Sequence, residues 1–139
     1  MVIHLLSCVG QKQLAPAPAR DLYTSSWFRK ARRYADSTGQ PWFILSAKHG
    51  LVHPDRVISP YNLTLNSMPV ADRRRWAQTV LTQLDPHLDG VESIVILAGR
   101  RYREFLEPSL QSRGLPVSVP MAGLRIGEQL RWLNRMLNG

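Results

Sequence analysis

The sequence has almost no cysteine and no long apolar run. Cys8 is the single cysteine among 139 residues, which excludes an internal disulfide and a metal site built on several cysteines. No apolar run approaches the roughly 18 residues that a membrane-spanning helix needs. A chain of this length can bury a core without disulfide or metal support. We therefore expect a cytoplasmic protein with no membrane partner.

Acidic residues and lysine are also scarce beside arginine. The chain has 18 Lys and Arg against 10 Asp and Glu, a formal net charge of +8, and most of the basic residues are arginine. Arginine pairs bidentately with phosphate and stacks on bases, so the expected partner is a nucleotide, a nucleoside or a nucleic acid. The alternative is a compositional bias without a specific partner, because net charge bears on association and not on fold.

Short apolar runs alternate with amphipathic stretches, and no repeat divides the chain. The pattern predicts strands over 2–6, 42–45, 93–97 and 116–120, and helices over 27–36, 70–84, 102–112 and 126–137. Pro108 is expected to kink or break the third helix. Such alternation is typical of one parallel sheet with right-handed crossovers. The sequence therefore predicts a single Rossmann-like α/β domain, with about four mainly parallel strands and helices on both faces.

Small and basic residues follow each predicted strand. Ligands of open α/β sheets bind beyond the carboxyl ends of the strands, so these residues form the predicted substrate site. They are Ser7, Cys8 and Lys12, then Ser46, Lys48 and His49, then Gly99, Arg100 and Tyr102, and finally Gly123. The alternative is ordinary turn chemistry, because neither the dinucleotide glycine pattern nor the phosphate-loop pattern is present.

Lys48 and His49 are the main catalytic candidates. A lysine at this place holds a phosphate or, when desolvated, acts as a base or Schiff-base amine, and a histidine shuttles a proton near neutral pH. Asp21 is the third candidate, expected to orient Arg20 or Lys48. The structural alternatives are a surface lysine, a histidine that caps a turn and an aspartate that does the same. Cys8 is weighed as a nucleophile against a buried small residue.

The loop over residues 54–65 is long enough to be a binding loop. Tyr61 in it is expected to stack a base while Asn62 reads the base edge, or else Tyr61 packs the loop onto the core. His4, inside the first strand, is expected to be a buried histidine with its hydrogen bonds satisfied. No cofactor is predicted and no metal-ligand set is present, although scattered carboxylates such as Asp21 and Asp55 are an alternative for Mg²⁺ bound through substrate phosphates.

Nearly the whole chain resembles a family of small bacterial and phage domains of unknown function. The resemblance is carried by Ser7-Cys8 with Lys12, by 15–23, 45–51 and 60–65, by 97–99 with Tyr102, and by segments within 123–133. Its most specific part is Ser-Ala-Lys-His-Gly-Leu at residues 46–51. Family members are loosely similar to the YaaA peroxide-stress proteins, which are associated with DNA binding and oxidative damage.

The resemblance also ranks the catalytic candidates. The family usually has tyrosine at the position of His49 and commonly aspartate at that of Asn62. This departure implies that His49 is not an indispensable acid–base group and that Asn62 needs no charge. Lys48 matches the motif and is the stronger candidate.

These observations predict a nucleotide- or nucleic-acid-directed enzyme that acts at a nucleobase or its glycosidic bond. In this hypothesis Lys48 contacts phosphate or the leaving base and Asp21 orients a cation or the ribose. The remaining expected contacts are anion clamps at Arg20 and Arg100, and aromatic walls at Tyr23 and Tyr61.

Two other hypotheses compete with the enzyme. The first is a non-catalytic DNA- or RNA-binding protein linked to DNA damage or stress, which would use the helix faces that carry residues 32–33 and 73–75. The second is a subunit of a larger assembly that docks through residues 126–137. A simpler account of that last helix is that it covers its own sheet.

Overall fold

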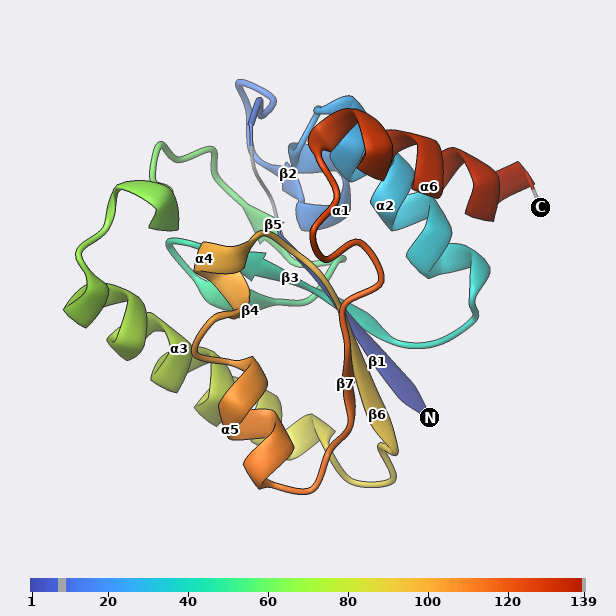
Figure 1. The fold of residues 1–139 in the computed structure, drawn as a ribbon. Helices are drawn as coiled ribbons and strands as arrows, with labels where there is room; N and C mark the ends of the chain where they lie inside the picture. Colours follow the sequence, from blue (N-terminus) through green and yellow to red (C-terminus); the bar gives the residue numbers. More distant parts are fainter. Residues whose placement is uncertain (8–9, 139) are drawn as a thin grey trace.

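A five-stranded, mostly parallel sheet organises the chain (Figure 1). The computed structural model describes residues 1–7 and 10–138. The strands follow the order β4-β3-β1-β6-β7, with β1 (Val2–Ser7) parallel to β3 (Trp42–Ser46) on one side and to β6 (Ser93–Leu97) on the other. β7 (Val117–Ser118) extends the parallel part, and β4 (Gly50–Val52) pairs antiparallel with β3. The prediction of an α/β domain with a mainly parallel sheet is confirmed.

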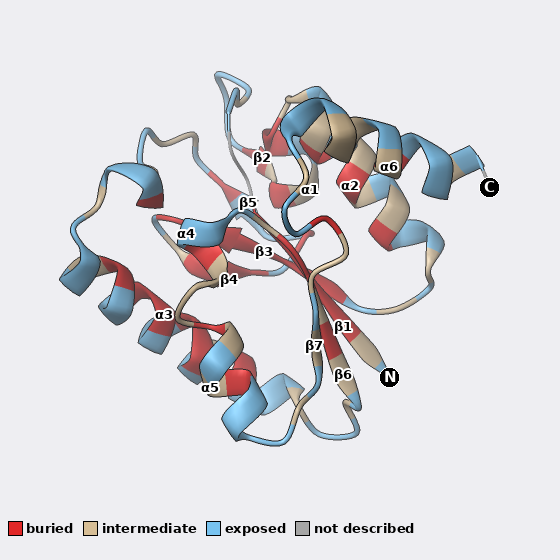
Figure 2. Ribbon diagram, in the orientation of Figure 1, coloured by how far each residue is buried: buried red, intermediate tan, exposed pale blue. Residues whose placement is uncertain are grey.

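Helices cover both faces of this sheet (Figure 1). One face is covered by α2 (Ser26–Ser37) and α6 (Ile126–Asn138), and the other by α3 (Val70–Leu84), α4 (Arg100–Arg103) and α5 (Glu107–Ser112). Leu5 of β1 packs in the core under α3, whereas Leu6 packs in the core under α2, because successive side chains of a strand point to opposite faces. Figure 2 shows buried residues concentrated on the strands and on the sides of the helices that face them.

Most predicted elements agree with the structure to within one or two residues. Ser25 caps α2, since its Oγ accepts a hydrogen bond of 3.2 Å from the Phe28 backbone N–H. α3 begins directly after Pro69. The predicted helix 102–112 is interrupted between α4 and α5, and Pro108 lies in the first turn of α5, so the expected break is confirmed.

The strand prediction needs two corrections. β4 was not predicted, because it has three residues and follows β3 after a tight turn, so only its pairing with β3 identifies it as a strand. The predicted strand 116–120 is shortened to β7, because a proline stands at each end of that range and proline has no N–H to donate to the ladder. The Pro116 carbonyl still accepts a hydrogen bond from the Ile94 N–H at 3.0 Å.

A short strand lies within the predicted loop over residues 54–65. This strand, β5 (Val57–Ile58), pairs antiparallel with β2 (Ala17–Pro18), and α1 (Ala19–Leu22) follows β2. The 3-10 helices η1 (Leu65–Ser67) and η2 (Asp85–His87) complete the elements. The chain before α2 and the chain after β4 are therefore held together beside the sheet.

The C-terminal helix packs on its own domain. Leu133 of α6 is fully buried in the core under α2, and the Trp132 ring meets the Tyr34 ring edge-on at 5.3 Å. Lys30 Nζ also donates a hydrogen bond to Asn134 Oδ1 at 2.6 Å. These contacts agree with the simpler account of the helix. In the described part of the chain, no helix has the length and apolarity that crossing a bilayer requires.

His4 lies inside β1 and is 4% exposed. Its ring meets the edge of Tyr34 at 6.1 Å. Within residues 1–7 and 10–138, no group donates to or accepts from its Nδ1 atom, so the expected burial is confirmed while the expected satisfaction of its hydrogen bonds is wrong. Burial lowers the pKa of His4 below its ordinary value, because a charged imidazolium is poorly solvated in the core.

We expect the free energy of unfolding to fall as the pH is lowered below about 6.5. The unfolded chain binds a proton at the ordinary histidine pKa, whereas buried His4 binds one only at lower pH, so acid favours unfolding. Urea unfolding measured between about pH 7.5 and 5 tests this. H4Q should flatten the profile and H87Q, at an exposed position, should not. An H4Q profile as steep as that of the parent chain would contradict the assignment.

Candidate functional site

The carboxyl ends of β1 and β6 lie at the point where the sheet topology reverses. The chain leaves β1 toward β3 on one side, and it leaves β6 toward β7 on the other. Connections that leave neighbouring parallel strands in opposite directions open a crevice, and open α/β sheets bind their ligands there. A ligand site is therefore expected at this edge of the sheet.

A crevice of about 410 Å³ occupies this position. Its floor includes Ser7, the last residue of β1, and its lining comes from the start of α2, from the turn after β6 and from the start of α6. The lining residues are Ser7, Ser25, Trp27, Gly99, Ile126, Gln129 and Leu130. A smaller pocket of about 150 Å³ also contains Trp27, Gly99 and Gln129 and extends the crevice toward Arg100 and Gly123. The surface is apolar with an aromatic wall, and a few polar groups are set into it.

The aromatic wall is held by a hydrogen-bonded bridge between the two helices of that face. Trp27 Nε1 donates to Gln129 Oε1 at 2.8 Å, and Gln129 Nε2 donates to the Leu124 carbonyl at 2.9 Å. The bridge positions the indole and the loop before α6 relative to each other. Ile126, at the rim, is 62% exposed.

A chain of hydroxyl groups lies beside the carboxyl end of β3. Ser46 Oγ donates to Tyr61 Oη at 2.8 Å, and Tyr61 Oη lies 2.8 Å from Tyr23 Oη. Lys12 Nζ sits 4.7 Å from the centre of the Tyr61 ring, a cation–π distance. The backbone N–H of His49 donates to Ser46 Oγ at 3.1 Å. The structure thus brings five of the predicted site residues together, and we call this group the hydroxyl cluster. Its members are Lys12, Tyr23, Ser46, His49 and Tyr61.

This cluster supports the anchoring interpretation of Tyr61. Tyr61 is half-buried against the core under α2, and its hydroxyl joins the loop to the end of β3. Its ring also meets the His49 ring at 5.8 Å and the Tyr23 ring at 6.4 Å, both edge-on. Stacking of a base on Tyr61 remains a prediction.

His49 and Lys48 lie on the turn between β3 and β4. Burial, with smaller effects of Arg56 and Lys48, lowers the pKa of His49 below its ordinary value, so its imidazole is neutral near pH 7 and able to accept a proton. Lys48 is exposed. The turn ends at Gly50, whose φ of +76° favours glycine, and the Gln83 amide holds both sides of it through the His49 carbonyl at 3.1 Å and the Leu51 N–H at 2.7 Å.

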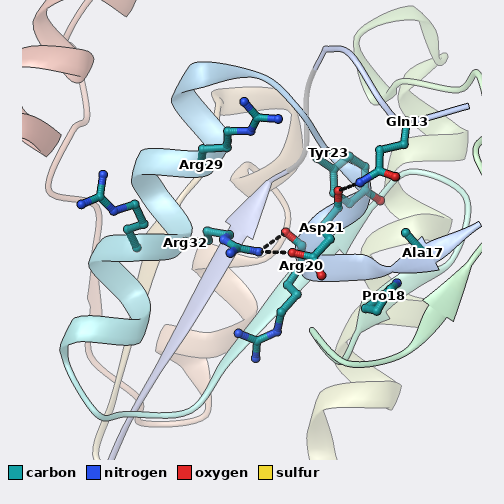
Figure 3. A pocket seen from close by; sticks show the side chains of 9 residues that line it. Gln13, Ala17, Pro18, Arg20, Asp21, Tyr23, Arg29 and Arg32 are labelled. Carbon is teal, nitrogen blue, oxygen red and sulfur yellow. Dashed lines mark hydrogen bonds and ion pairs between the residues drawn. The ribbon is translucent and has the colours of Figure 1, made fainter.

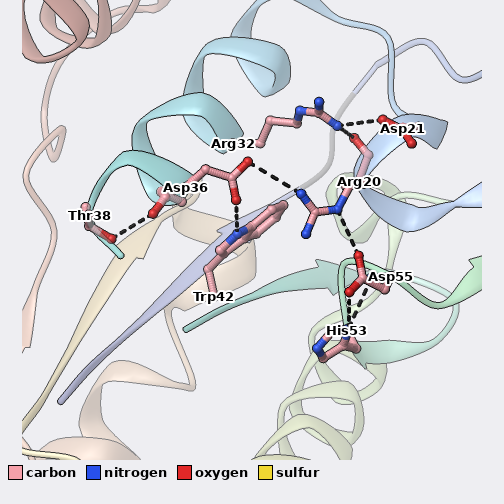
Figure 4. A network of polar contacts seen from close by, with 9 residues as sticks. Arg20, Asp21, Arg32, Asp36, Thr38, Trp42, His53 and Asp55 are labelled. Carbon is pink, nitrogen blue, oxygen red and sulfur yellow. Dashed lines mark hydrogen bonds and ion pairs between the residues drawn. The ribbon is translucent and has the colours of Figure 1, made fainter. Parts of the chain in front are cut away.

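Arg20 and Asp21 have other partners than expected (Figure 4). Asp21 Oδ1 accepts a hydrogen bond of 2.7 Å from Arg32 Nη1, so its ion pair is neither with Arg20 nor with Lys48. Arg20 Nε donates to Asp55 Oδ1 at 3.0 Å, and its guanidinium lies over the ring of Trp42, the first residue of β3. Arg20 is therefore directed to the amino end of β3, whereas Ser46 lies at the opposite, carboxyl end of that strand.

The other predicted residues are scattered around the sheet edge. Tyr102 is 2% exposed, and its ring packs edge-on against Trp76. Asn62, Gly99, Arg100 and Gly123 are exposed, and Cys8 lies outside the described residues. Within residues 1–7 and 10–138, no group of three or more His, Cys, Asp or Glu side chains is placed to hold a metal ion.

Ser25, Trp27 and Gln129 were missed in the sequence, although they shape the crevice. Ser25 caps α2, and Trp27 lies at the start of the predicted helix 27–36. The one local signal was the position of Trp27 in the first turn of the helix that follows β1. Gln129 carries no such signal, because it reaches the crevice only when α6 packs against α2.

The chain is similar to proteins whose function is unassigned. A family model described as a family of unknown function, DUF6884, matches residues 3–135. The uncharacterized protein YfjM of Bacillus subtilis (strain 168) is 30% identical over 132 residues, which cover 90% of this chain and 83% of that protein. No solved structure matches the chain. The matched range includes the crevice and the hydroxyl cluster.

Proposed function

The chain belongs to the DUF6884 family of unknown function, and from that starting point we propose that it is a nucleotide- or nucleic-acid-directed enzyme acting at a nucleobase or its glycosidic bond. The observation that carries the proposal is the crevice at the switch point of the sheet, with the Trp27 indole as its wall. In this proposal the domain is of the Rossmann-like type and works in the cytoplasm. The suggested similarity to YaaA proteins, which are associated with DNA binding, agrees with such a partner.

The lining of the crevice suits a planar heterocycle. Its volume of about 410 Å³ falls in the range of small-molecule sites, which are mostly apolar with few polar groups. Stacking of a base on an aromatic side chain contributes about 1–3 kcal/mol. Ser7 and Ser25 line the same surface. Ser25 Oγ accepts the capping hydrogen bond from Phe28, and its hydroxyl proton can still be donated to the polar edge of a base.

The hydroxyl cluster supplies groups for proton transfer and charge stabilisation. In hydrolysis of a glycosidic bond the bond between sugar carbon and base nitrogen breaks, and its electron pair leaves with the base. Water forms the new bond to the sugar carbon and loses a proton, which a neutral imidazole such as that of His49 accepts. An ammonium group stabilises the departing base, and the structure adds Lys12 to Lys48 as a candidate for this role.

Two variants of α6 test the site. Ile126→Glu places a carboxylate at the exposed rim of the crevice, and Met136→Glu places the same charge on the same helix at a position that is 46% exposed. A nucleotide at about 100 times its dissociation constant stabilises the folded parent chain by about 2.7 kcal/mol, which raises the unfolding temperature by several degrees. We expect I126E to abolish this shift through loss of apolar contact and repulsion of phosphate, and M136E to retain it.

The measurement is a thermal-shift panel of nucleobases, nucleosides, nucleotides and short oligonucleotides at low and moderate salt. Equal loss of the shift in I126E and M136E would place the ligand outside the crevice. The absence of a shift from every member of the panel would contradict the proposal.

The competing hypothesis of a non-catalytic binder has less support in the arginine runs. Arg73 is 8% exposed and pairs with Glu104, and Arg75 pairs with Asp72 on the surface. Arg32 pairs with Asp21. Because three of the five arginines already have acidic partners, the two runs do not form free basic stripes on the helix faces.

A further inference from the structure

A second cavity, of about 530 Å³, lies beside α2 (Figure 3). Four arginines and one carboxylate are among its lining residues, which are Gln13, Ala17, Pro18, Arg20, Asp21, Tyr23, Arg29, Arg32 and Arg33. We call this cavity the arginine pocket. We propose that it binds the sugar–phosphate backbone of a single-stranded nucleic acid, so that the base entering the crevice belongs to a polynucleotide and not to a free nucleotide. This inference rests on the proposed function of the crevice.

Two of the four arginines are already positioned. Arg32 Nη1 donates to Asp21 Oδ1 at 2.7 Å and to the Arg20 carbonyl at 2.6 Å, as the dashed lines in Figure 3 show. Arg20 is held by Asp55 at 3.0 Å and by Asp36 at 3.5 Å (Figure 4). The carboxylates near the pocket are thus paired with Arg20 and Arg32, and these ion pairs hold the two side chains in place beside the pocket.

The other two arginines carry uncompensated charge. Arg29 and Arg33 are exposed, and across residues 1–7 and 10–138 neither guanidinium has a hydrogen-bond or ion-pair partner. They are four positions apart on one helix, where like charges repel each other and destabilise the helix. A phosphate between them relieves that repulsion, and the planar guanidinium matches phosphate in bidentate geometry.

One helix connects the arginine pocket to the crevice. Ser25 and Trp27, at the start of α2, line the crevice, and Arg29 follows within one turn and lines the pocket. At 3.6 residues per turn the arginines point away from the side on which Trp27 contacts α6. In this proposal a strand with one base in the crevice passes around α2, so that its neighbouring phosphates lie at the pocket.

A crevice that takes up one base favours a single strand over a duplex. A base inside a duplex is stacked and paired, so an enzyme that acts on it must extrude it first, whereas a base of a single strand enters a pocket directly. Deoxyribose and ribose strands share the phosphate chemistry that the arginines recognise. Both kinds of strand are therefore tested.

The test compares two double variants with the same change of charge. R29Q/R33Q removes the free arginines of the pocket, and R131Q/R135Q removes two exposed arginines with the same spacing on α6. The probes are a fluorescent single-stranded DNA of about 12 nucleotides and an RNA of the same sequence. Anisotropy titrations between about 50 and about 200 mM salt give the affinity and its salt dependence.

We expect R29Q/R33Q to weaken oligonucleotide binding by about tenfold or more at low salt. The slope of log affinity against log salt should fall by about 1.4, from two lost contacts at about 0.7 each in a single strand. R131Q/R135Q should stay within about threefold of the parent chain. The thermal shift from a nucleoside monophosphate should persist in R29Q/R33Q, and both variants should unfold near the temperature of the parent chain.

Three results would overturn the inference. Equal weakening in both double variants would show an effect of net charge alone. Loss of the monophosphate shift in R29Q/R33Q would make the pocket part of a free-nucleotide site. Nucleotide binding that depends on Ile126, together with no preference for oligonucleotides, would leave the proposed function standing without the backbone site.

The reverse result separates the two proposals. If no nucleotide binds in the crevice but oligonucleotides bind through Arg29 and Arg33, the proposed function fails. The backbone site would then stand by itself. DNA and RNA affinities that differ in the parent chain would assign the natural strand.

Discussion

Replacing Arg73 with alanine is expected to lower the free energy of unfolding by about 3–5 kcal/mol. Arg73 is 8% exposed, and its Nε donates to Glu104 Oε1 at 2.7 Å while its Nη1 donates to the Met68 carbonyl. The variant leaves the Glu104 carboxylate, 22% exposed, without the cation that compensates it. The loss is large because a partly buried charge that has lost its partner retains its desolvation cost.

Arg75, two residues further along the same helix, provides the control. Its side chain is 74% exposed, and its ion pair with Asp72 lies on the surface, so R75A should cost no more than about 0.5 kcal/mol. The free energy of unfolding of both variants is measured by urea denaturation, with the same dependence on urea concentration fitted to both. Equal losses in R73A and R75A would mean that the Arg73 pair is as solvated as a surface pair.

The Arg73 pair also bears on the candidate site. It ties α3 to Glu104, the C-cap residue directly after α4, and α4 begins directly after Gly99 in the crevice lining. We therefore expect that R73A weakens ligand binding in the crevice as well as folding. A double variant with E104A should lose less stability than the sum of the single variants, because neither charge is then left unpaired.

Truncating Phe28 to alanine is the second change with a large expected effect, about 3–5 kcal/mol. Phe28 is fully buried between α2 and the sheet, and its ring centre lies 5.1 Å from that of Tyr23. The variant loses the apolar burial of the ring and leaves a cavity that the rigid sheet fills only in part. Tyr23 then loses the packing that holds its hydroxyl against Tyr61.

Phe28→Leu is the matched comparison, because it keeps most of the apolar volume and should cost less than about 1.5 kcal/mol. Thermal or urea unfolding of the two variants gives the difference. F28A and F28L of equal stability would show that the site relaxes around the missing ring. In that case the buried aromatic pair would not be what holds α2 against the cluster of hydroxyl groups.

The candidate site was predictable where it follows from the ends of strands. Ser7 ends β1 and Ser46 ends β3, and parallel pairing of those strands brings their carboxyl ends to one edge. His49 was placed at this edge by its short distance from Ser46 along the chain. The role of Lys48 remains a prediction, because the structure leaves its side chain exposed.

The predicted partner was wrong where a charged residue has several possible partners elsewhere in the chain. Asp21 was expected to orient Arg20 or Lys48, but its ion pair is with Arg32, 11 residues away. Arg20 pairs instead with Asp55, 35 residues away. The identity of an arginine or aspartate in the sequence does not specify which opposite charge it pairs with in the folded chain. The pairing depends on how α1 is placed between β4 and α2, and this placement follows from packing of the whole face.

By itself, the sequence determined the local elements and the general architecture. The apolar run of β6, the periodicity of α3 and the proline in α5 act through neighbouring residues, so their effects are visible in a short window of sequence. Only the tertiary structure decided the shape of the crevice. Its wall depends on the hydrogen bond from Trp27 to Gln129 across 102 residues of chain, and no local preference specifies a contact that forms only when two helices pack on the same face of a completed sheet.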